Sequence, residues 1–344
     1  METNAGSVPQ RWQPGPMWTL VFLAPFIAEV SSGATKLSII FVLIPEMMVW
    51  GCGALIIREL VRRWGGGWPS LLALGLGLSI AEEFIVQQTS LAPLPFPGAL
   101  LHYGRAGGVN WIYFLFMLGF ESVWVVLVPV GVTELIFKSR SRMLWLRTKG
   151  MGIAAIIFLL GARIAWYAWV KRARPMVLHV PEYHASTTMV GAGFAAILLL
   201  AVLAYAMRRM GVAPVPSRWT PPAWVAGWTV LVLALPWYAL MGFVFRPQEP
   251  RIAFWIPLVA GVTWAIVAIA VIGSWVRSPQ WGDPHRWAAT LAATLVCMGA
   301  GFAGSGAWSR VDLIGKIVFN TLAVVGFLML LRTVRRRAAE TSAS

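Results

Sequence analysis

Stretches of the first 121 residues that are otherwise apolar enough to span a membrane contain five glutamates: Glu29, Glu46, Glu82, Glu83 and Glu121. A carboxylate in the hydrocarbon core of a bilayer costs roughly 3 kcal/mol on insertion scales. Each of the five must therefore be protonated, paired, hydrated or bound to a cation. Carboxylates in such a setting can relay protons, bind cations, or act as a general acid and base.

The five glutamates are predicted to converge. At a rise of about 1.5 Å per residue, Glu121 lies roughly 16 Å and Glu46 about 12 Å from the outer ends of their helices, and the other three lie within about 9 Å of the surface. All five occupy the outer half of the bilayer on four consecutive helices, which predicts one polar cavity that opens outward. The alternative is that Glu29, Glu82 and Glu83 only line the interface, solvated by water.

Polar neighbours extend this candidate site. Ser79, Glu83 and Gln87 are spaced i, i+4, i+8, which places them on one face of a helix. Asn110 and Tyr113 enter the next predicted helix from the same outer side. The residues expected to bind a ligand or an ion are first Glu46, Glu83 and Glu121, and then Glu82, Glu29, Arg163 and Gln87.

Arg163 is the only basic residue well inside a predicted span. A buried guanidinium needs an acceptor, and a carboxylate that accepts two of its hydrogen bonds is the best one. We therefore expect Arg163 to pair with one of the five glutamates. The alternative is that its side chain snorkels to the outer surface.

Two other acids are explained by their neighbours in the sequence. Glu59 is followed by Arg62 and Arg63 at i+3 and i+4, and Glu134 is followed by Lys138 at i+4. Both acids are predicted to form surface ion pairs at the inner ends of helices, outside the candidate site.

One predicted outer loop, His179-Val180-Pro181-Glu182-Tyr183-His184, contains two histidines and a carboxylate. A metal ion could use His179 and His184 with ligands from elsewhere in the chain. However, Pro181 prevents the helical i, i+4 pair that metal sites often use. The loop is therefore predicted to be solvated and to hold no metal, and no cofactor is indicated by the sequence.

Composition assigns the chain to the membrane proteins. Of its 344 residues, 58% are hydrophobic and 12% are charged, whereas soluble domains have about 25% charged residues. A net charge of +15 would suggest nucleic-acid binding in a soluble protein, but the basic residues here cluster in short loops between apolar stretches. The expected partner is the lipid bilayer and not nucleic acid, with another membrane protein or a second copy of the chain as further options.

The apolar stretches predict an all-α, polytopic transmembrane bundle of about ten spans, at roughly 20 residues per span. Basic residues favour one side of the predicted loops about two to one, which places both termini in the cytoplasm and the chain in a bacterial inner membrane. The exception is the run Lys171-Arg172-Ala173-Arg174, which falls in an outer loop. The predicted spans are 17–31, 38–57, 68–88, 110–135, 150–170, 187–207, 223–244, 253–275, 287–306 and 313–332.

Four segments follow from these spans. A cytoplasmic leader occupies residues 1–16, and the first four helices, which contain the glutamates, occupy 17–135. Six more apolar helices occupy 136–332. A cytoplasmic tail, first basic and then polar, occupies 333–344. The first span is interpreted as an uncleaved helix because its leader is long and rich in proline.

The sequence Ala81-Glu82-Glu83-Phe84 resembles the first motif of the CPBP (CAAX-type) intramembrane endopeptidases, in which paired glutamates on a helix activate water. The resemblance implies a hydrolase with Glu82 or Glu83 as its base. The chain departs from the family at Gln87, where the family has an arginine, and its four histidines fall in predicted loops. Glu121 stands where a partner histidine would be expected.

A longer stretch, roughly residues 20–135, is similar to a group of multi-pass bacterial membrane proteins that have no assigned activity. This likeness implies the same fold class and no particular reaction. It rests on Leu55-Ile56-Ile57-Arg58-Glu59-Leu60, Gly67-Trp68-Pro69-Ser70, the Glu82-Glu83 pair, Tyr103-Gly104-Arg105 and Val109-Asn110-Trp111.

Three functions are compatible with this pattern. The favoured one is not enzymatic: the carboxylates bind or move a cation, a proton or a small polar solute. The second is hydrolysis within the membrane by a glutamate base. The third is a structural or assembly subunit of a membrane complex, in which the acids pair with a partner.

Overall fold

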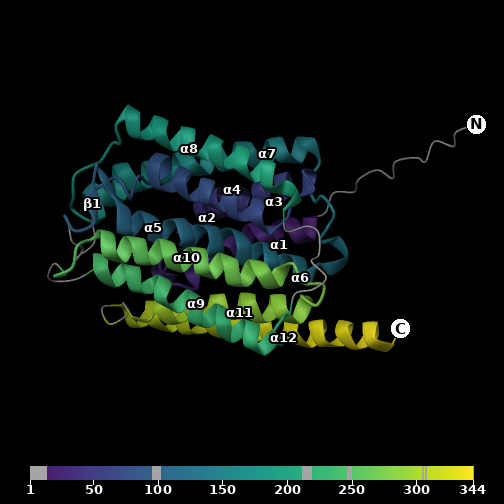
Figure 1. Cartoon of the computed structure of the whole chain (residues 1–344). Coiled ribbons are helices and arrows are strands. Elements are labelled where there is room, and N and C mark those ends of the chain that lie inside the picture. Colours follow the sequence, from purple (N-terminus) through teal and green to yellow (C-terminus); the bar gives the residue numbers. More distant parts are fainter. Residues whose placement is uncertain are drawn as a thin grey trace, which may run out of the picture.

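The computed structural model describes residues 14–94, 102–210, 219–245, 250–303, 306 and 308–343. These residues form long helices that run along one bundle, with the connections at its two ends (Figure 1). The strands found in the described residues, β1 (Arg105–Ala106) and β2 (Val109–Asn110), form one antiparallel hairpin. This hairpin lies at one end of the bundle, which we call the hairpin end (Figure 1). The predicted all-α class is confirmed.

The first part of the chain forms three helices that each change type along their length. The bounds are α1 (Pro14–Pro25) with a π-helical segment Phe26–Val30; a 3₁₀ segment Leu37–Val42, α2 (Leu43–Glu46), a π-helical segment Met47–Gly51 and α3 (Cys52–Arg63); and α4 (Trp68–Ala81) with a π-helical segment Glu82–Val86.

The rest of the chain follows in the predicted order. The bounds are α5 (Trp111–Phe120), a π-helical segment Glu121–Leu127 and α6 (Val128–Ile136); a 3₁₀ turn Lys138–Arg140; α7 (Thr148–Trp166) with a π-helical segment Tyr167–Val177; α8 (Thr187–Ala206) with a 3₁₀ turn Met207–Arg209; α9 (Ala223–Val244); α10 (Trp255–Val276); α11 (Asp283–Ala300); and α12 (Arg310–Ala343).

Length and surface both identify a membrane protein. Eight helices of the described residues are long and apolar enough to cross a membrane, and a shorter apolar helix, Pro14–Val30, precedes them. Large apolar side chains cover the outer helices, and Leu198 and Leu199 of α8 are each 67% exposed. A soluble monomer does not expose apolar surface on this scale. The chain is therefore a polytopic helical membrane protein, while the ten spans and the cytoplasmic termini stay predictions.

Two segments that were predicted to be non-helical are helical. The helix that begins with α7 continues through Tyr167–Val177, so the basic run 171–174 lies in the helix and not in a loop. Likewise, α12 continues to Ala343 through most of the predicted tail. Charged residues can extend a spanning helix because their long side chains reach past the apolar layer to water. Alanine, arginine and glutamate also have high helix propensity.

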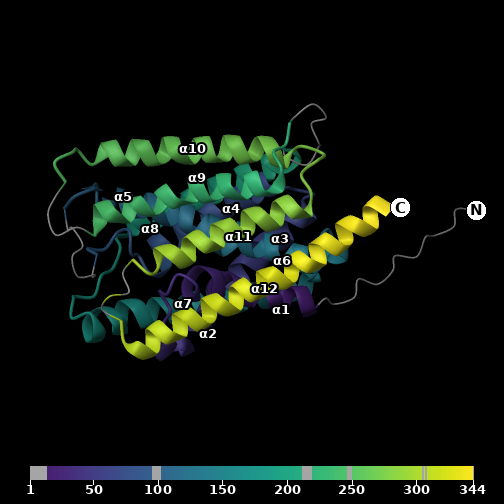
Figure 2. The same cartoon turned by 90° about the horizontal axis from the view of Figure 1, so that it is seen from below.

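The glutamate-bearing helices form the centre of the bundle. In the most apolar windows of Trp68–Val86 and Trp111–Ile136, 67% of the residues are buried, compared with 11% in Thr187–Arg209. The central helices also approach closely: a Cβ added at Gly51 would lie 2.3 Å from the carbonyl oxygen of Val21 in α1, so only glycine fits there. In the outer layer α12 crosses the bundle obliquely (Figure 2).

Reporter fusions are expected to place the two ends of the bundle on opposite sides of the membrane. The connections near residues 66 and 144 lie at the end opposite the hairpin, and residue 178 lies toward the hairpin end (Figure 1). With cytoplasmic termini, fusions at 66 and 144 should report the cytoplasm and a fusion at 178 the outside. A cytoplasmic signal at 178 would contradict the orientation from α7 onward.

Candidate functional site

The structure brings the five glutamates together, and we call them the glutamate cluster. At most 5% of the surface is exposed in Glu46, Glu82, Glu83 and Glu121, and Glu29 is half-buried. Glu29 lies close enough to Glu46 and Glu82 for their charges to interact, and Glu121 does so with Glu82, Glu83 and Glu29. Four separate helices therefore contribute carboxylates to one buried region.

Every glutamate of the cluster lies in or beside a π-helical segment. Glu29 lies within Phe26–Val30, Glu82 and Glu83 begin Glu82–Val86, Glu121 begins Glu121–Leu127, and Glu46 directly precedes Met47–Gly51. Short π-helical segments within α-helices are rare, and they occur often at functional sites. The segment Tyr167–Val177 contains no member of the cluster, so π-helical structure accompanies the site without defining it.

Two hydroxyl groups donate hydrogen bonds to the cluster. Thr35 Oγ1 donates to Glu46 Oε1, and Ser90 Oγ donates to Glu83 Oε2 at 2.6 Å. Both donors lie in the connections at the hairpin end, and both are buried. The connections that cover this end of the bundle thus also hold two of the carboxylates in place.

Several polar atoms of the cluster, and of the predicted site residues Ser79 and Asn110, have no hydrogen-bond partner among the described residues. These atoms are both carboxylate oxygens of Glu82 and of Glu121, Oε2 of Glu46, the Ser79 hydroxyl, and both side-chain amide atoms of Asn110. Buried polar groups are nearly always hydrogen-bonded in folded proteins, and the exceptions are often functional. These atoms are therefore available to bind protons or a polar ligand.

No basic side chain forms an ion pair with the cluster in the described part of the chain, although the buried Lys316 donates to the carbonyl oxygens of Ser31 and Ser32, close to Glu29 in the sequence. The ion pairs there involve other acids, and none includes a glutamate of the cluster. In the same residues, no three acidic, histidine or cysteine side chains are arranged to hold a metal ion. A buried carboxylate with neither a base nor a metal is stable only when it is protonated or hydrated.

Tyr113 lies at the centre of the cluster. Its phenol is 8% exposed and is close enough to Glu83, Glu121, Glu29 and Glu82 for electrostatic interaction with each. A phenol can donate one hydrogen bond and accept another. Tyr113 is therefore the neutral group best placed to connect carboxylates that come from different helices.

The predicted polar stripe of Ser79, Glu83 and Gln87 is rearranged. The Gln87 side chain lies beside Glu82, although without the geometry of a hydrogen bond, while Glu83 bonds to Ser90. The cause is the π-helical segment Glu82–Val86, in which the backbone bonds from i to i+5, as in Gln87 N to Glu82 O at 2.9 Å. Spacing rules for an α-helix do not hold across that segment.

Arg163 does not pair with the cluster as predicted. It lies on the exposed side of α7, with its guanidinium 4.4 Å from the centre of the Trp166 ring, and none of the ion pairs between described residues includes it. The structure therefore agrees with the alternative, an arginine whose charge is kept near the surface by an aromatic face.

Arg163→Ala is expected to change the free energy of unfolding by less than about 0.5 kcal/mol, because exposed residues away from special features have small effects. Thermal unfolding of the purified variant in detergent measures this. A clear loss of stability would contradict this expectation and would support the buried ion pair that the sequence predicted.

Glu59 and Glu134 are buried rather than exposed, which corrects the prediction for both. Glu59 is fully buried and pairs with Arg58 at 2.6 Å and with Arg63 at 3.2 Å. Glu134 pairs with Arg58 at 3.2 Å and with Arg62 at 2.6 Å, across two helices. Lys138 pairs instead with Asp283 of α11. These residues lie at the end opposite the hairpin, and they hold helices together outside the cluster.

The histidines lie away from the cluster where the structure describes them. His184 Nε2 is 3.4 Å from Glu182 Oε2, and both residues are exposed. A hydrogen bond from Lys171 to Glu182 at 2.5 Å lowers the pKa of that carboxyl. His179 is exposed, and His285 bonds to the Pro221 carbonyl oxygen at 2.9 Å. None of these contacts forms a catalytic pair with Glu82 or Glu83.

Sequence reasoning missed Thr35 and Ser90. Thr35 lies in the short connection between Val30 and Leu37, and Ser90 lies near the start of the long connection between Val86 and Trp111. A signal was present, because hydroxyls in the connections next to buried carboxylates are natural donors. Which carboxylate each one reaches depends on how the connection folds, which local spacing does not reveal.

Comparison of the chain with known protein families, with curated proteins and with solved structures gives no match. The candidate site is therefore interpreted from its own geometry.

Proposed function

We propose that the glutamate cluster binds protons reversibly inside a bacterial inner membrane, and that the protein moves protons, alone or together with a small polar solute. The observation that carries this proposal is the set of buried carboxylate oxygens on Glu82 and Glu121 that receive no hydrogen bond from the described residues. A buried carboxylate without a hydrogen bond is strongly stabilised when it takes up a proton, because protonation removes its charge.

Proton binding is favoured over metal binding by the arrangement of the carboxylates. A calcium or magnesium site needs several oxygen ligands within about 2.0–2.6 Å of one point. No such group of side chains is found among the described residues, although the carboxylates interact over longer distances. Separated carboxylates with hydroxyl groups beside them suit stepwise proton transfer instead: Thr35 bonds to Glu46, Ser90 bonds to Glu83, and Tyr113 lies near the others.

The hydrolase reading has less support. The adjacent pair Glu82 and Glu83 is present and buried, as a water-activating pair would need to be. However, Gln87 replaces the arginine of the family that the motif resembles. His184 contacts Glu182, and His285 contacts the Pro221 carbonyl oxygen. The paired glutamates are thus present without the arginine of that family's motif.

Proteoliposomes test the proposed function. The full chain is reconstituted with a pH-sensitive dye inside the vesicles, and an inward pH gradient is imposed with a potassium-valinomycin clamp to prevent charge build-up. We expect proton entry faster than in empty vesicles and proportional to the amount of protein. Entry at the rate of empty vesicles, both without solute and with a panel of small polar solutes, would contradict proton movement.

A further inference from the structure

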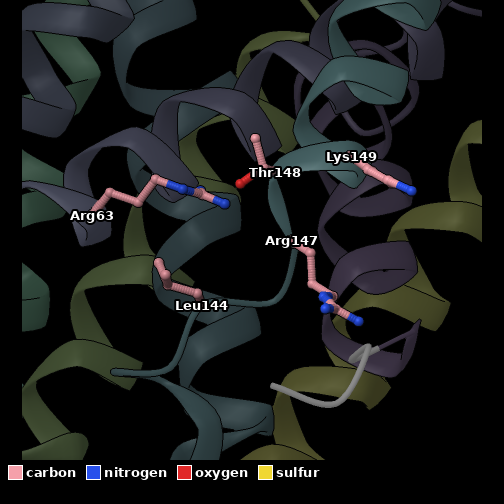
Figure 3. A pocket seen from close by; sticks show the side chains of 5 residues that line it. All are labelled: Arg63, Leu144, Arg147, Thr148 and Lys149. Carbon is pink, nitrogen blue, oxygen red and sulfur yellow. The ribbon is translucent and has the colours of Figure 1, made fainter. Parts of the chain in front are cut away.

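A pocket of about 390 Å³ lies at the end of the bundle opposite the hairpin. It is lined by Arg63, Leu144, Arg147, Thr148 and Lys149 (Figure 3). Arg63 reaches toward Thr148 from the end of α3, while Arg147 and Lys149 extend from the start of α7 (Figure 3). Three basic residues and one hydroxyl residue therefore line a space large enough for a phosphate group.

Of the three basic residues that line this pocket, only Arg63 has an acidic partner among the described residues. Arg63 bonds to Glu59 at 3.2 Å and to the Leu146 carbonyl oxygen at 2.7 Å. Arg147 and Lys149 are exposed, and neither belongs to an ion pair between described residues. Two unpaired cations beside one paired arginine give the pocket a net positive charge.

The start of α7 adds donors to the same pocket. No side chain caps this helix at Arg147, so the N–H groups of its first turn keep their free hydrogen-bonding capacity. The helix dipole also favours an anion at this position. Basic side chains, a hydroxyl and free backbone N–H groups together match the oxygens of a phosphate ester.

An exposed apolar stripe begins at the pocket and runs along α7. Lys149 is followed on the same face by Ile153, Ile156, Leu160 and Ile164, at successive steps of three or four residues. These four apolar side chains are 46–60% exposed. From Ile153 to Ile164 the stripe measures about 17 Å, close to the roughly 15 Å thickness of one leaflet's hydrocarbon.

We propose that this pocket and stripe bind one anionic phospholipid, with its phosphate in the pocket and an acyl chain along α7. The charge of the pocket selects an anionic headgroup, and the adjoining stripe distinguishes a lipid from a free phosphate ion. Basic pockets at the ends of membrane helices are suited to such headgroups. The site lies at the opposite end from the glutamate cluster and does not depend on its function.

Native mass spectrometry of the detergent-solubilised full chain tests the proposal, with phosphatidylglycerol and phosphatidylcholine added separately. We expect phosphatidylglycerol to bind more tightly than phosphatidylcholine. In Arg147→Ala/Lys149→Ala its apparent affinity should fall roughly 30-fold, from the attraction that two basic residues supply near an anionic lipid. Arg63 is left unchanged because it also bonds to Glu59.

The matched control is Arg140→Ala/Arg142→Ala. It removes the same charge from the same connection, and both residues are exposed and outside the pocket. The Trp145 indole bonds to the backbone oxygen of Arg140, which alanine retains. This control should bind phosphatidylglycerol as the parent protein does. An equal loss in both double variants would show diffuse attraction and overturn the proposal, as would equal binding of the two lipids.

Inorganic phosphate distinguishes a lipid site from a phosphate site. We expect millimolar phosphate neither to displace bound phosphatidylglycerol nor to raise the melting temperature of the parent protein. Displacement, together with a rise in melting temperature that Arg147→Ala/Lys149→Ala abolishes, would assign the pocket to free phosphate and overturn the lipid assignment.

Discussion

Arg58→Ala is expected to lower the free energy of unfolding by about 3–5 kcal/mol, because it removes the fully buried cation that two buried carboxylates share. Arg58 is fully buried and donates to Glu59 at 2.6 Å and to Glu134 at 3.2 Å. It also donates to the carbonyl oxygens of Ser141 and Met143, at 2.6 Å and 2.7 Å. One guanidinium thus joins α3 to α6 and to the connection that leads to α7.

Glu59 makes the loss of Arg58 more costly. Its carboxylate also accepts hydrogen bonds from the backbone N–H groups of Trp145 and Leu146, which hold the same connection. The central carbon of the Arg58 guanidinium lies 3.5 Å from the centre of the Trp145 ring, and Trp145 is fully buried. Removal of Arg58 therefore leaves Glu59 and Glu134 with one arginine each, opens a cavity and loosens residues 141–146.

Denaturant or thermal unfolding in detergent measures this effect, with Arg142→Ala as the control because that exposed arginine lies in the same connection. Arg58→Lys should rescue only part of the stability, since an ammonium cannot reproduce the fork of the guanidinium. If Arg58→Ala does not yield folded protein, the milder Glu134→Gln provides the comparison. Parent-like unfolding of Arg58→Ala would show that this network contributes little to the fold.

The fold class could be predicted because apolar runs of about 20 residues have few alternatives to a spanning helix. The ends of helices were less predictable. A prediction from hydropathy places the end of a helix where charged residues begin. In the structure, however, the run 171–174 and most of the tail after residue 332 are helical. Backbone hydrogen bonding continues until something interrupts it, and charged side chains that reach water do not interrupt it.

The burial of the cluster was predictable from the cost of a carboxylate in hydrocarbon, but its contacts were not. Gln87 was assigned to Glu83 by α-helical spacing, and the π-helical segment moved it to Glu82. Glu134 was assigned to Lys138 by the same i, i+4 rule, and it pairs with Arg58 and Arg62 instead. Local spacing gives the pairs available within one helix, whereas a buried charge takes the best partner that packing brings near.

Glu→Gln substitution separates a functional cluster from a merely structural one. Glutamine keeps the size of the side chain and one acceptor oxygen, so Ser90 can still donate to residue 83 and Thr35 to residue 46. Only ionisation and proton binding are lost. We expect at least two of the variants Glu46→Gln, Glu83→Gln and Glu121→Gln to reduce proton entry into proteoliposomes to the rate of empty vesicles.

Stability should not follow activity in these variants. A neutral amide costs less than a carboxylate inside the membrane, so the melting temperature should be unchanged or higher. Glu340→Gln is the control, because that exposed carboxylate near the end of α12 only pairs with Arg336 at 3.6 Å. Parent-like proton entry in all three cluster variants would rule out a proton-binding role. Loss of entry together with a lower melting temperature in each would instead assign the glutamates to packing, because the loss of entry would then follow from a destabilised fold.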